Sequence, residues 1–382
     1  MGSIYENSYV TIAATNASNS GTRCLVDRRK PVKITYENTT GKKFAIRARK
    51  IVDHHPIAKD GKPAKLTGPL MTRAWTLQEH VLSTRILHYT ATELLFECRT
   101  SCRCECLSSR RASPTTPSLI PRAIAKKNGS VDAVWDAWQH VVEQYSKREL
   151  TVPSDRLPAI SGIAAKIKDA TRSSYIAGLW KENLVSDLLW SSSPNSSPAY
   201  ALDSYRAPSF SWASLNTAVS YYMPDPEERE TFTPTITLIA SSIGLKGLNP
   251  LGTVFDASLK IRGPCLDALL CSLQKDGIWE YTLLIKGTSA IRISHDCLLF
   301  EEEDTAASPP STKTVRRAHS NTILSQFKTS VQCLSVARYD SWISGLVLGR
   351  SRRVPGTWER LGTFASGIES FRKAEERLII AV

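Results

Sequence analysis

The residues from Gly68 to His80, Gly-Pro-Leu-Met-Thr-Arg-Ala-Trp-Thr-Leu-Gln-Glu-His, form the densest group of side chains in this chain that are suited to chemistry. On a helix, Thr72, Thr76 and Glu79 fall near one face, as do Arg73 and Leu77 four residues apart. A carboxylate beside a guanidinium and an indole can hold a charged sugar or act as a general base. The alternative interpretation is structural: the two charges pair with neighbours and the indole enters the core. From the residues alone, the structural interpretation is favoured.

A second group of reactive side chains is the cysteine run Cys98, Cys102, Cys104 and Cys106. Four thiols suit a tetrahedral zinc site, but this spacing is unlike the paired cysteines of most zinc knuckles. In a strand, the last three would share one face, and Arg99 and Arg103 would lower the pKa of a nearby thiol. We interpret the run as structural thiols, with zinc binding as the lesser alternative, and assign no metal ligand from the sequence.

Composition excludes several classes of protein. The 382 residues are 42% hydrophobic, which argues against a largely disordered chain. No window approaches about 18 uninterrupted apolar residues, and the first ten residues do not resemble an export signal, so no membrane association is expected. The nine cysteines are odd in number, which favours reduced thiols and a cytoplasmic location.

Ten of the thirteen excess positive charges lie in the first 120 residues. They are spread singly among apolar residues and lack a recognisable nucleic-acid motif, so a solvated basic face is expected and nucleic-acid binding is not. Gly-x-Gly-x-x-Gly, P-loop and Gly-x-Ser-x-Gly sequences are also missing, which argues against conventional dinucleotide or nucleotide binding and against a serine hydrolase.

The elements that must position these side chains are expected first in residues 1–106. A strand is predicted over residues 9–14, a hairpin over 32–48, a short helix from about residue 73, and strands over 85–89 and 93–98. The hairpin is predicted because apolar and polar residues alternate on both sides of a Thr-Thr-Gly turn. Residues 107–130, with three prolines, are predicted to be a linker.

The remaining chain is predicted to have a helical middle region, 131–215, and a β-rich C-terminal region, 216–382. Apolar residues recur at helical spacing in 131–150, and further helical stretches are predicted over 155–171 and 175–190. An acidic run followed by Ser-Pro-Pro predicts a disordered insertion at 301–317. The fold class is therefore predicted as mixed α+β.

Arg73-Ala-Trp-Thr-Leu-Gln-Glu79, followed by Leu82-Ser-Thr-Arg85 and Leu87-His-Tyr89, resembles the closing block of the fungal heterokaryon-incompatibility (HET) domain. Further segments resemble other parts of such proteins in the same order. These are residues 4–14, 95–98, 155–162, 175–180, 206–214 and 360–364.

Two earlier blocks of that family, Ser-Tyr-x-Trp-Gly and Trp-x-Asp-x-x-Cys-Ile-x-Gln, are absent from this sequence. The resemblance therefore implies a truncated HET domain that lacks its N-terminal half. It further implies a role in fungal non-self recognition and regulated cell death, with a protein partner or self-association.

HET domains are thought to resemble the Toll/interleukin-receptor (TIR) fold, so the resemblance implies a partial TIR-like α/β segment at the N-terminus and NAD as a substrate. Glu79 would then be the catalytic residue, and Arg73, Trp75 and Gln78 would bind NAD. We do not expect NAD cleavage from the chain as written, because the missing blocks would supply the walls of the pocket. The alternatives are an NAD-cleaving enzyme once upstream sequence is restored, a non-enzymatic interaction module, and an inactive remnant.

Overall fold

The computed structural model describes residues 1–25, 32–48, 68–105, 116–125, 131–193, 199–222, 226–304 and 312–382. It confirms the mixed α+β class with a β-rich C-terminal region. The chain divides into two compact units, one formed by Met1–Ala137 with Arg148–Leu150, the other by Trp138–Lys147 with Thr151–Val382. The finer division at residues 106, 130 and 215 stays a prediction. In the described ranges, no helix combines the length and apolar character needed to cross a bilayer.

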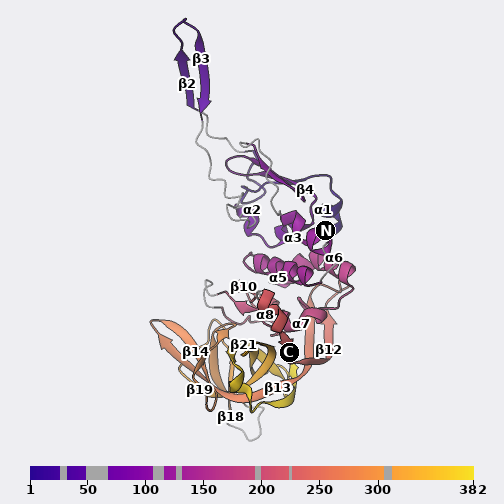
Figure 1. The fold of residues 1–382 in the computed structure, drawn as a ribbon, viewed down its shortest axis with the longest axis vertical. Helices are drawn as coiled ribbons and strands as arrows, with labels where there is room; N and C mark the ends of the chain where they lie inside the picture. Colours follow the sequence, from indigo (N-terminus) through magenta and orange to yellow (C-terminus); the bar gives the residue numbers. More distant parts are fainter. Residues whose placement is uncertain are drawn as a thin grey trace. The chain divides into compact units, whose positions relative to one another are not determined.

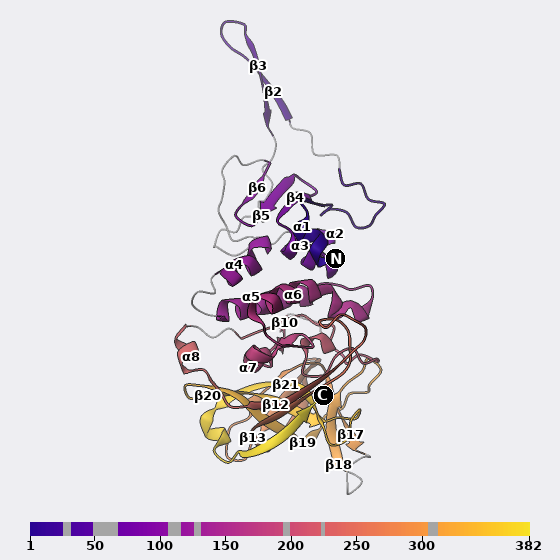
Figure 2. The same cartoon turned by 90° about the vertical axis from the view of Figure 1, so that its right-hand side faces the viewer.

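The first unit is built on a four-stranded sheet in the order β1-β4-β5-β6, whose last three strands lie side by side in Figure 2. β1 runs parallel to β4, and the other two pairs are antiparallel. Alternate residues of β4 and β5 are buried, as the period of a half-buried strand requires. The elements of this unit are α1 (Gly2–Asn7), β1 (Thr11–Ala13), β2 (Val32–Glu37), β3 (Lys43–Ala48), α2 (Pro69–Thr72), α3 (Trp75–Leu82), β4 (Arg85–Tyr89), β5 (Leu94–Cys98), β6 (Cys102–Cys104) and α4 (Leu119–Ala125).

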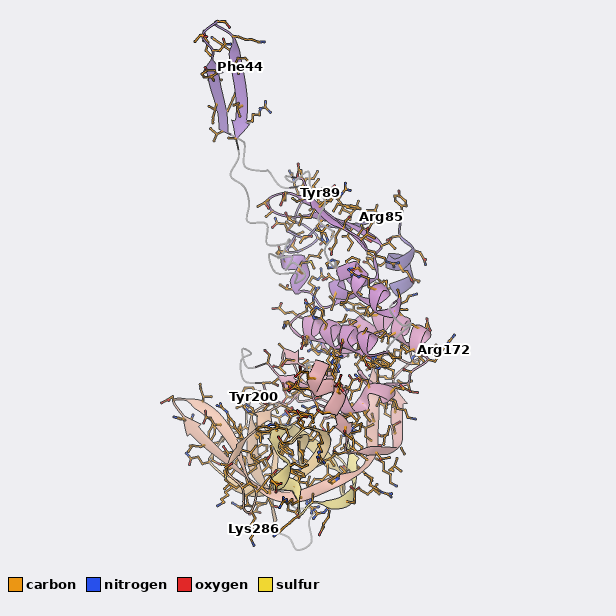
Figure 3. All side chains as sticks on the ribbon, viewed as in Figure 1. Phe44, Arg85, Tyr89, Arg172, Tyr200 and Lys286 are labelled. Atoms are coloured by element: carbon orange, nitrogen blue, oxygen red, sulfur yellow. The ribbon has the colours of Figure 1, made fainter. Side chains whose placement is uncertain are left out.

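The predicted hairpin is confirmed as the antiparallel pair β2 and β3, on which Figure 3 labels Phe44. Directly opposed residues share a face, so Ile34 and Ile46 lie beside Tyr36 and Phe44. All twelve residues of the two strands are exposed, including this apolar face.

The linker prediction for 107–130 is wrong where the structure describes that segment. Residues 116–118 form a 3₁₀ turn that leads into α4, and Ile120 and Ala123 are buried. Pro121 is tolerated because the first N–H groups of a helix have no intrahelical partner. Two of the three prolines, Pro117 and Pro121, therefore lie in the first turns of a helical segment and not in a linker.

The helix predicted from residue 131 is confirmed as α5 (Asp132–Ser146), whose Trp138, Val142 and Tyr145 are fully buried at helical spacing. Two 3₁₀ turns, Pro153–Arg156 and Pro158–Ile160, precede α6 (Ser161–Thr171).

The helical stretch predicted over 175–190 is wrong in its first half. Residues 175–180 form a small hairpin, β7 (Tyr175–Ile176) with β8 (Leu179–Trp180), and only α7 (Leu184–Asp187) is α-helical. The turn forms because Gly178 takes a φ of +103°, a conformation that glycine adopts easily. Its carbonyl accepts hydrogen bonds from the indoles of Trp138 (3.3 Å) and Trp212 (3.0 Å), which fixes the turn in the core.

We expect Gly178→Ala to lower the free energy of unfolding by about 3 kcal/mol, since a Cβ adds backbone strain and overpacks the core. That Cβ would lie 2.8 Å from Nε1 of Trp212. The control is Gly277→Ala, at φ +79° with nothing within 4 Å of the added Cβ, which should cost about 1 kcal/mol. Urea denaturation followed by circular dichroism measures both, and equal costs would contradict the packing role of Gly178.

The β-rich part of the second unit contains five strands whose pairing closes on itself. The strand β13 (Val254–Lys275) pairs β19 (Lys328–Tyr339), and the path continues through β20 (Trp342–Arg350), β21 (Trp358–Gly367) and β22 (Glu375–Ala381) back to β13. In Figure 1 these strands, orange to yellow, curve around one another. The strand β13 has 22 residues. It pairs with β12 (Thr237–Leu245) and β22 in its first half and with β19 and β14 (Ile278–Leu284) in its second. The partner changes from β12 to β19 between Arg262 and Cys265 of β13. Pro264 lies in this interval and has no N–H to donate to a neighbouring strand.

The remaining strands of this unit and the helix α8 are short. In chain order they are β9 (Ser191–Ser192), β10 (Val219–Ser220), α8 (Pro226–Thr231), β11 (Thr233–Pro234), β15 (Ile291–Arg292), β16 (Ser294–His295), β17 (Leu299–Asp304) and β18 (Thr312–Arg317).

The disordered insertion predicted at 301–317 is wrong at both of its described ends, which form the antiparallel pair β17 and β18. The acidic run faces the basic one across the pair, so the charges attract each other. Lys313 donates to Glu301 at 2.6 Å, and Arg316 pairs with Glu302. Cross-strand charge pairing of this kind stabilises a strand pair that composition alone would class as disordered.

The core of the second unit contains a fully buried carboxylate, Asp296, shared by two guanidinium groups. Arg360 donates to its Oδ1 at 2.9 Å and Arg317 to its Oδ2 at 3.0 Å. The Arg360 guanidinium also lies 3.6 Å from the ring centre of Trp190. Burial lowers the pKa of Arg360, and the charge and hydrogen bond of Asp296 offset part of this effect. The resulting pKa of about 10 keeps the arginine charged at neutral pH.

Candidate functional site

Helix α3 carries three of the four predicted site residues, Trp75, Gln78 and Glu79, and Arg73 lies just before it. The first turn of α3 is fixed by Thr76. The Thr76 hydroxyl lies 2.8 Å from the carbonyls of both Leu70 and Arg73, either of which can accept its proton, and it accepts a hydrogen bond from Arg148 at 2.9 Å. At the other end, Ser83 donates to the carbonyl of Glu79 at 2.7 Å. Both ends of the helix are therefore held by side-chain hydrogen bonds.

Glu79 is half-buried and receives a hydrogen bond from Tyr5 of α1. Burial raises its pKa above the ordinary value, against the opposing effects of Tyr5 and of the positive charge of Arg73. Burial and the Glu79 charge in turn raise the pKa of Tyr5 to about 12, so its hydroxyl keeps the proton that it donates. The sequence prediction did not include Tyr5, since its position four residues into the chain gave no signal for this contact.

The other three predicted residues differ in exposure, and Gln78 does not share a solvent-accessible surface with Glu79. Arg73 is exposed, Trp75 is half-buried, and Gln78 is only 3% exposed and lies in the interior. A ligand in solvent can reach Arg73 but not Gln78. The predicted catalytic and NAD-binding roles of these four residues stay proposals.

A second group of polar side chains converges in the interior of the first unit. Nε2 of His80 lies 2.6 Å from Oε2 of Glu97, and Nε2 of His88 lies 3.3 Å from the same oxygen. The two rings meet edge-on, with centres 5.2 Å apart. The three residues come from α3, β4 and β5, and Thr15 lies behind them, 3.1 Å from Nδ1 of His88.

The charges in this group are strongly coupled. Burial alone would raise the pKa of Glu97, but the charges and hydrogen bonds of His80 and His88 hold it far below the usual range. Burial lowers the pKa of His88, which Glu97 partly offsets. Sequence reasoning did not assign a role to these residues. The alternation of β4 and β5 was the available signal, because it turns His88 and Glu97 inward together.

Of the cysteine run, Cys98, Cys102 and Cys104 are described and are not in disulfides with described residues, and Cys106 lies outside the described residues. Burial would raise the pKa of Cys98, but hydrogen bonds with Ser101 and Thr100 lower it to about 7. The sequence predicted that Arg99 and Arg103 would lower the pKa of a nearby thiol, but for Cys98 the hydroxyl groups of Thr100 and Ser101 lower it.

Cys102 differs from Cys98, since burial and the nearby Glu97 raise its pKa to about 12. In the part of the chain that the structure describes, the side chains of metal-ligating type that converge are His80, His88 and Glu97, without the cysteines.

Residues 1–79 match the family model of the heterokaryon incompatibility protein (HET). Over these residues the chain is similar to the HET family. No curated protein and no solved structure matches the chain significantly. The HET match includes α1, the hairpin β2–β3 and α3 as far as Glu79, so it contains the contact between Tyr5 and Glu79. His80, His88 and Glu97 lie beyond it.

Proposed function

We propose that this chain acts in non-self recognition and regulated cell death as a HET-domain protein, and that it signals through contact with a protein partner or a second copy of itself. The observation that carries the proposal is the HET match over residues 1–79. The Arg73-Ala-Trp-Thr-Leu-Gln-Glu79 segment, which ends that match, supports it.

The exposed apolar face of the β2–β3 hairpin supports a contact function. Ile34 and Ile46 are opposed on this face, and 52% and 62% of their respective surfaces are accessible. Exposed apolar patches of this kind often mark interaction sites. The hairpin lies within the HET match, so this face is a surface through which the HET segment would bind its partner.

NAD cleavage is the second candidate function, and the Glu79 site favours it. A half-buried carboxylate held by Tyr5 and near the charge of Arg73 has groups suited to a ribose and a phosphate. A TIR-like arrangement of the N-terminal segment is part of this second candidate. The buried position of Gln78 argues against all four predicted residues contacting one nucleotide.

Induced expression of the chain in a fungal host, followed by colony counts, tests the two functions against each other. For signalling by contact, wild type kills, Glu79→Gln kills equally, and Ile34→Lys with Ile46→Lys does not. The matched control is Thr35→Lys with Ala45→Lys, which places the same charges on the opposite face of the same opposed strands and should still kill. Survival of cells that express wild type would contradict the proposal.

Purified chain incubated with NAD, with nicotinamide release as the readout, tests the enzymatic candidate directly. We expect no turnover from the 382-residue chain. Turnover that Glu79→Gln abolishes, together with loss of killing by the same variant, would replace the contact mechanism by NAD cleavage.

A further inference from the structure

The group formed by His80, His88 and Glu97 has the geometry of an unassigned metal site. Its three residues are 7%, 2% and 9% exposed, and they come from three different elements. The candidate ligand atoms all lie within 4.8 Å of one another. Two imidazole nitrogens with one carboxylate oxygen are a donor set that suits Zn²⁺.

The distances leave room for an ion with little rearrangement. Zinc lies about 2.0–2.2 Å from such ligands, which in a tetrahedral site puts the ligand atoms about 3.4 Å apart. The separation between His88 Nε2 and Glu97 Oε2 is already 3.3 Å. The contact between His80 and Glu97, at 2.6 Å, has to lengthen, and the candidate nitrogens of the two histidines already lie within 4.8 Å of each other.

Hydrogen bonding around His88 favours a lone pair on its Nε2. Thr15 is fully buried, and its hydroxyl can donate to the carbonyl of Ala13 at 3.4 Å. Thr15 can then accept a hydrogen bond from Nδ1 of His88. In this tautomer Nε2 carries no proton and faces the Glu97 carboxylate, whereas in the other tautomer Nε2 donates to that carboxylate. A lone pair opposite an anion is repulsive, and a cation bound between the two removes the repulsion. A hydroxyl on the outer nitrogen of a ligand histidine is a common means of orienting it.

His80 gives an independent observation. Its Nδ1 is buried and has no hydrogen-bond partner among the residues that the structure describes. Those residues therefore leave one nitrogen of this imidazole unsatisfied, although the ring is held against Glu97.

We propose that His80, His88 and Glu97 bind one Zn²⁺ ion, with Thr15 as the residue that positions His88. The ion would have three protein ligands and a fourth position for water, as in zinc sites with an open position. It would join α3 to β4 and β5, the elements that carry Glu79 and the strands next to it. The proposal does not depend on the proposed function, because its three ligands lie beyond the HET match.

The test uses the full chain, stripped with a chelator and titrated with Zn²⁺ by calorimetry. We expect one ion per chain and a higher melting temperature in its presence, whereas Mg²⁺ should not raise that temperature because it prefers oxygen ligands. His88→Gln and Glu97→Gln should each weaken Zn²⁺ binding about a hundredfold or more, and Thr15→Val about tenfold.

Two control variants separate this site from other ligands. Cys102→Ser changes a thiol directly opposite Glu97 in β6 and should leave Zn²⁺ binding unchanged. His54→Gln with His55→Gln removes the paired histidines, which lie outside the described residues, and should also leave one ion bound.

Where a ligand variant fails to fold, the absorption spectrum of Co²⁺ bound to the wild-type chain serves instead. We expect a spectrum typical of nitrogen and oxygen ligands, without the charge-transfer bands that sulfur ligands produce. Absence of binding to wild type, full affinity in folded His88→Gln and Glu97→Gln, or a thiolate spectrum would each overturn the proposal.

Discussion

Asp296→Ala is expected to lower the free energy of unfolding by about 3–5 kcal/mol, because it leaves two buried guanidinium groups without their counter-charge. Asp296 is fully buried and accepts hydrogen bonds from Arg360 and Arg317 through separate oxygens. Arg360 keeps its contacts with the carbonyls of Leu188 and Trp190, but carbonyls do not neutralise a charge. Urea denaturation followed by circular dichroism measures the loss.

The control for this prediction is Asp267→Ala in the same unit. Asp267 also pairs with an arginine, Arg377, at 3.1 Å, but its side chain is exposed. Exposed ion pairs contribute about 0–1 kcal/mol, so this variant should be nearly neutral. A similar loss in both variants would show that burial does not determine the contribution of Asp296.

Trp212→Ala is expected to cost about 3–5 kcal/mol, since it removes a large side chain from a packed core. The indole is fully buried, donates to Gly178 and meets the ring of Tyr145 edge-on at 5.7 Å. The guanidinium of Arg156 lies 5.7 Å from its ring, so the substitution also removes a cation–π contact.

Trp342→Ala is the matched control, because Trp342 is 50% exposed at the start of β20. Its loss should cost no more than about 1 kcal/mol. Circular dichroism at a range of urea concentrations suits both variants, since it does not depend on the tryptophan that is removed. Equal midpoints for the two would contradict the assignment of Trp212 to the core.

Regular spacing allowed the long elements to be predicted from the sequence. The helical period of Trp138, Val142 and Tyr145 predicted α5, and the alternation around Ile34 and Ile46 predicted the β2–β3 hairpin. In both cases the pattern is local, so the residues concerned determine the element without reference to distant parts of the chain.

The elements that sequence reasoning missed depend on partners elsewhere in the chain. The turn at Gly178 is held by indoles from residues 138 and 212, and the acidic run of β17 needs the basic residues of β18 opposite it. Neither partner is visible in the local pattern. Composition alone therefore predicted a helix in the first case and disorder in the second.

The same reasoning applies to the candidate sites. Glu79 was predicted from a motif, but its contact with Tyr5 needed the packing of α1 on α3. His80, His88 and Glu97 come together only in the register that sets Ile86 opposite Glu97 and His88 opposite Leu95. That register is a tertiary property, which one sequence does not reveal.

The long strand β13 has a consequence for the order in which the second unit assembles. Its neighbours in the chain, β12 and β14, can pair with it after closing short loops, whereas β19 and β22 begin only at residues 328 and 375. Loop closure costs more entropy as the loop lengthens, and contacts distant in sequence slow folding. The three-stranded segment β12-β13-β14 is therefore expected to form early, and the ring to close late and slowly when β22 docks. During synthesis, the first half of β13 would expose an unpaired edge until the last strand has emerged.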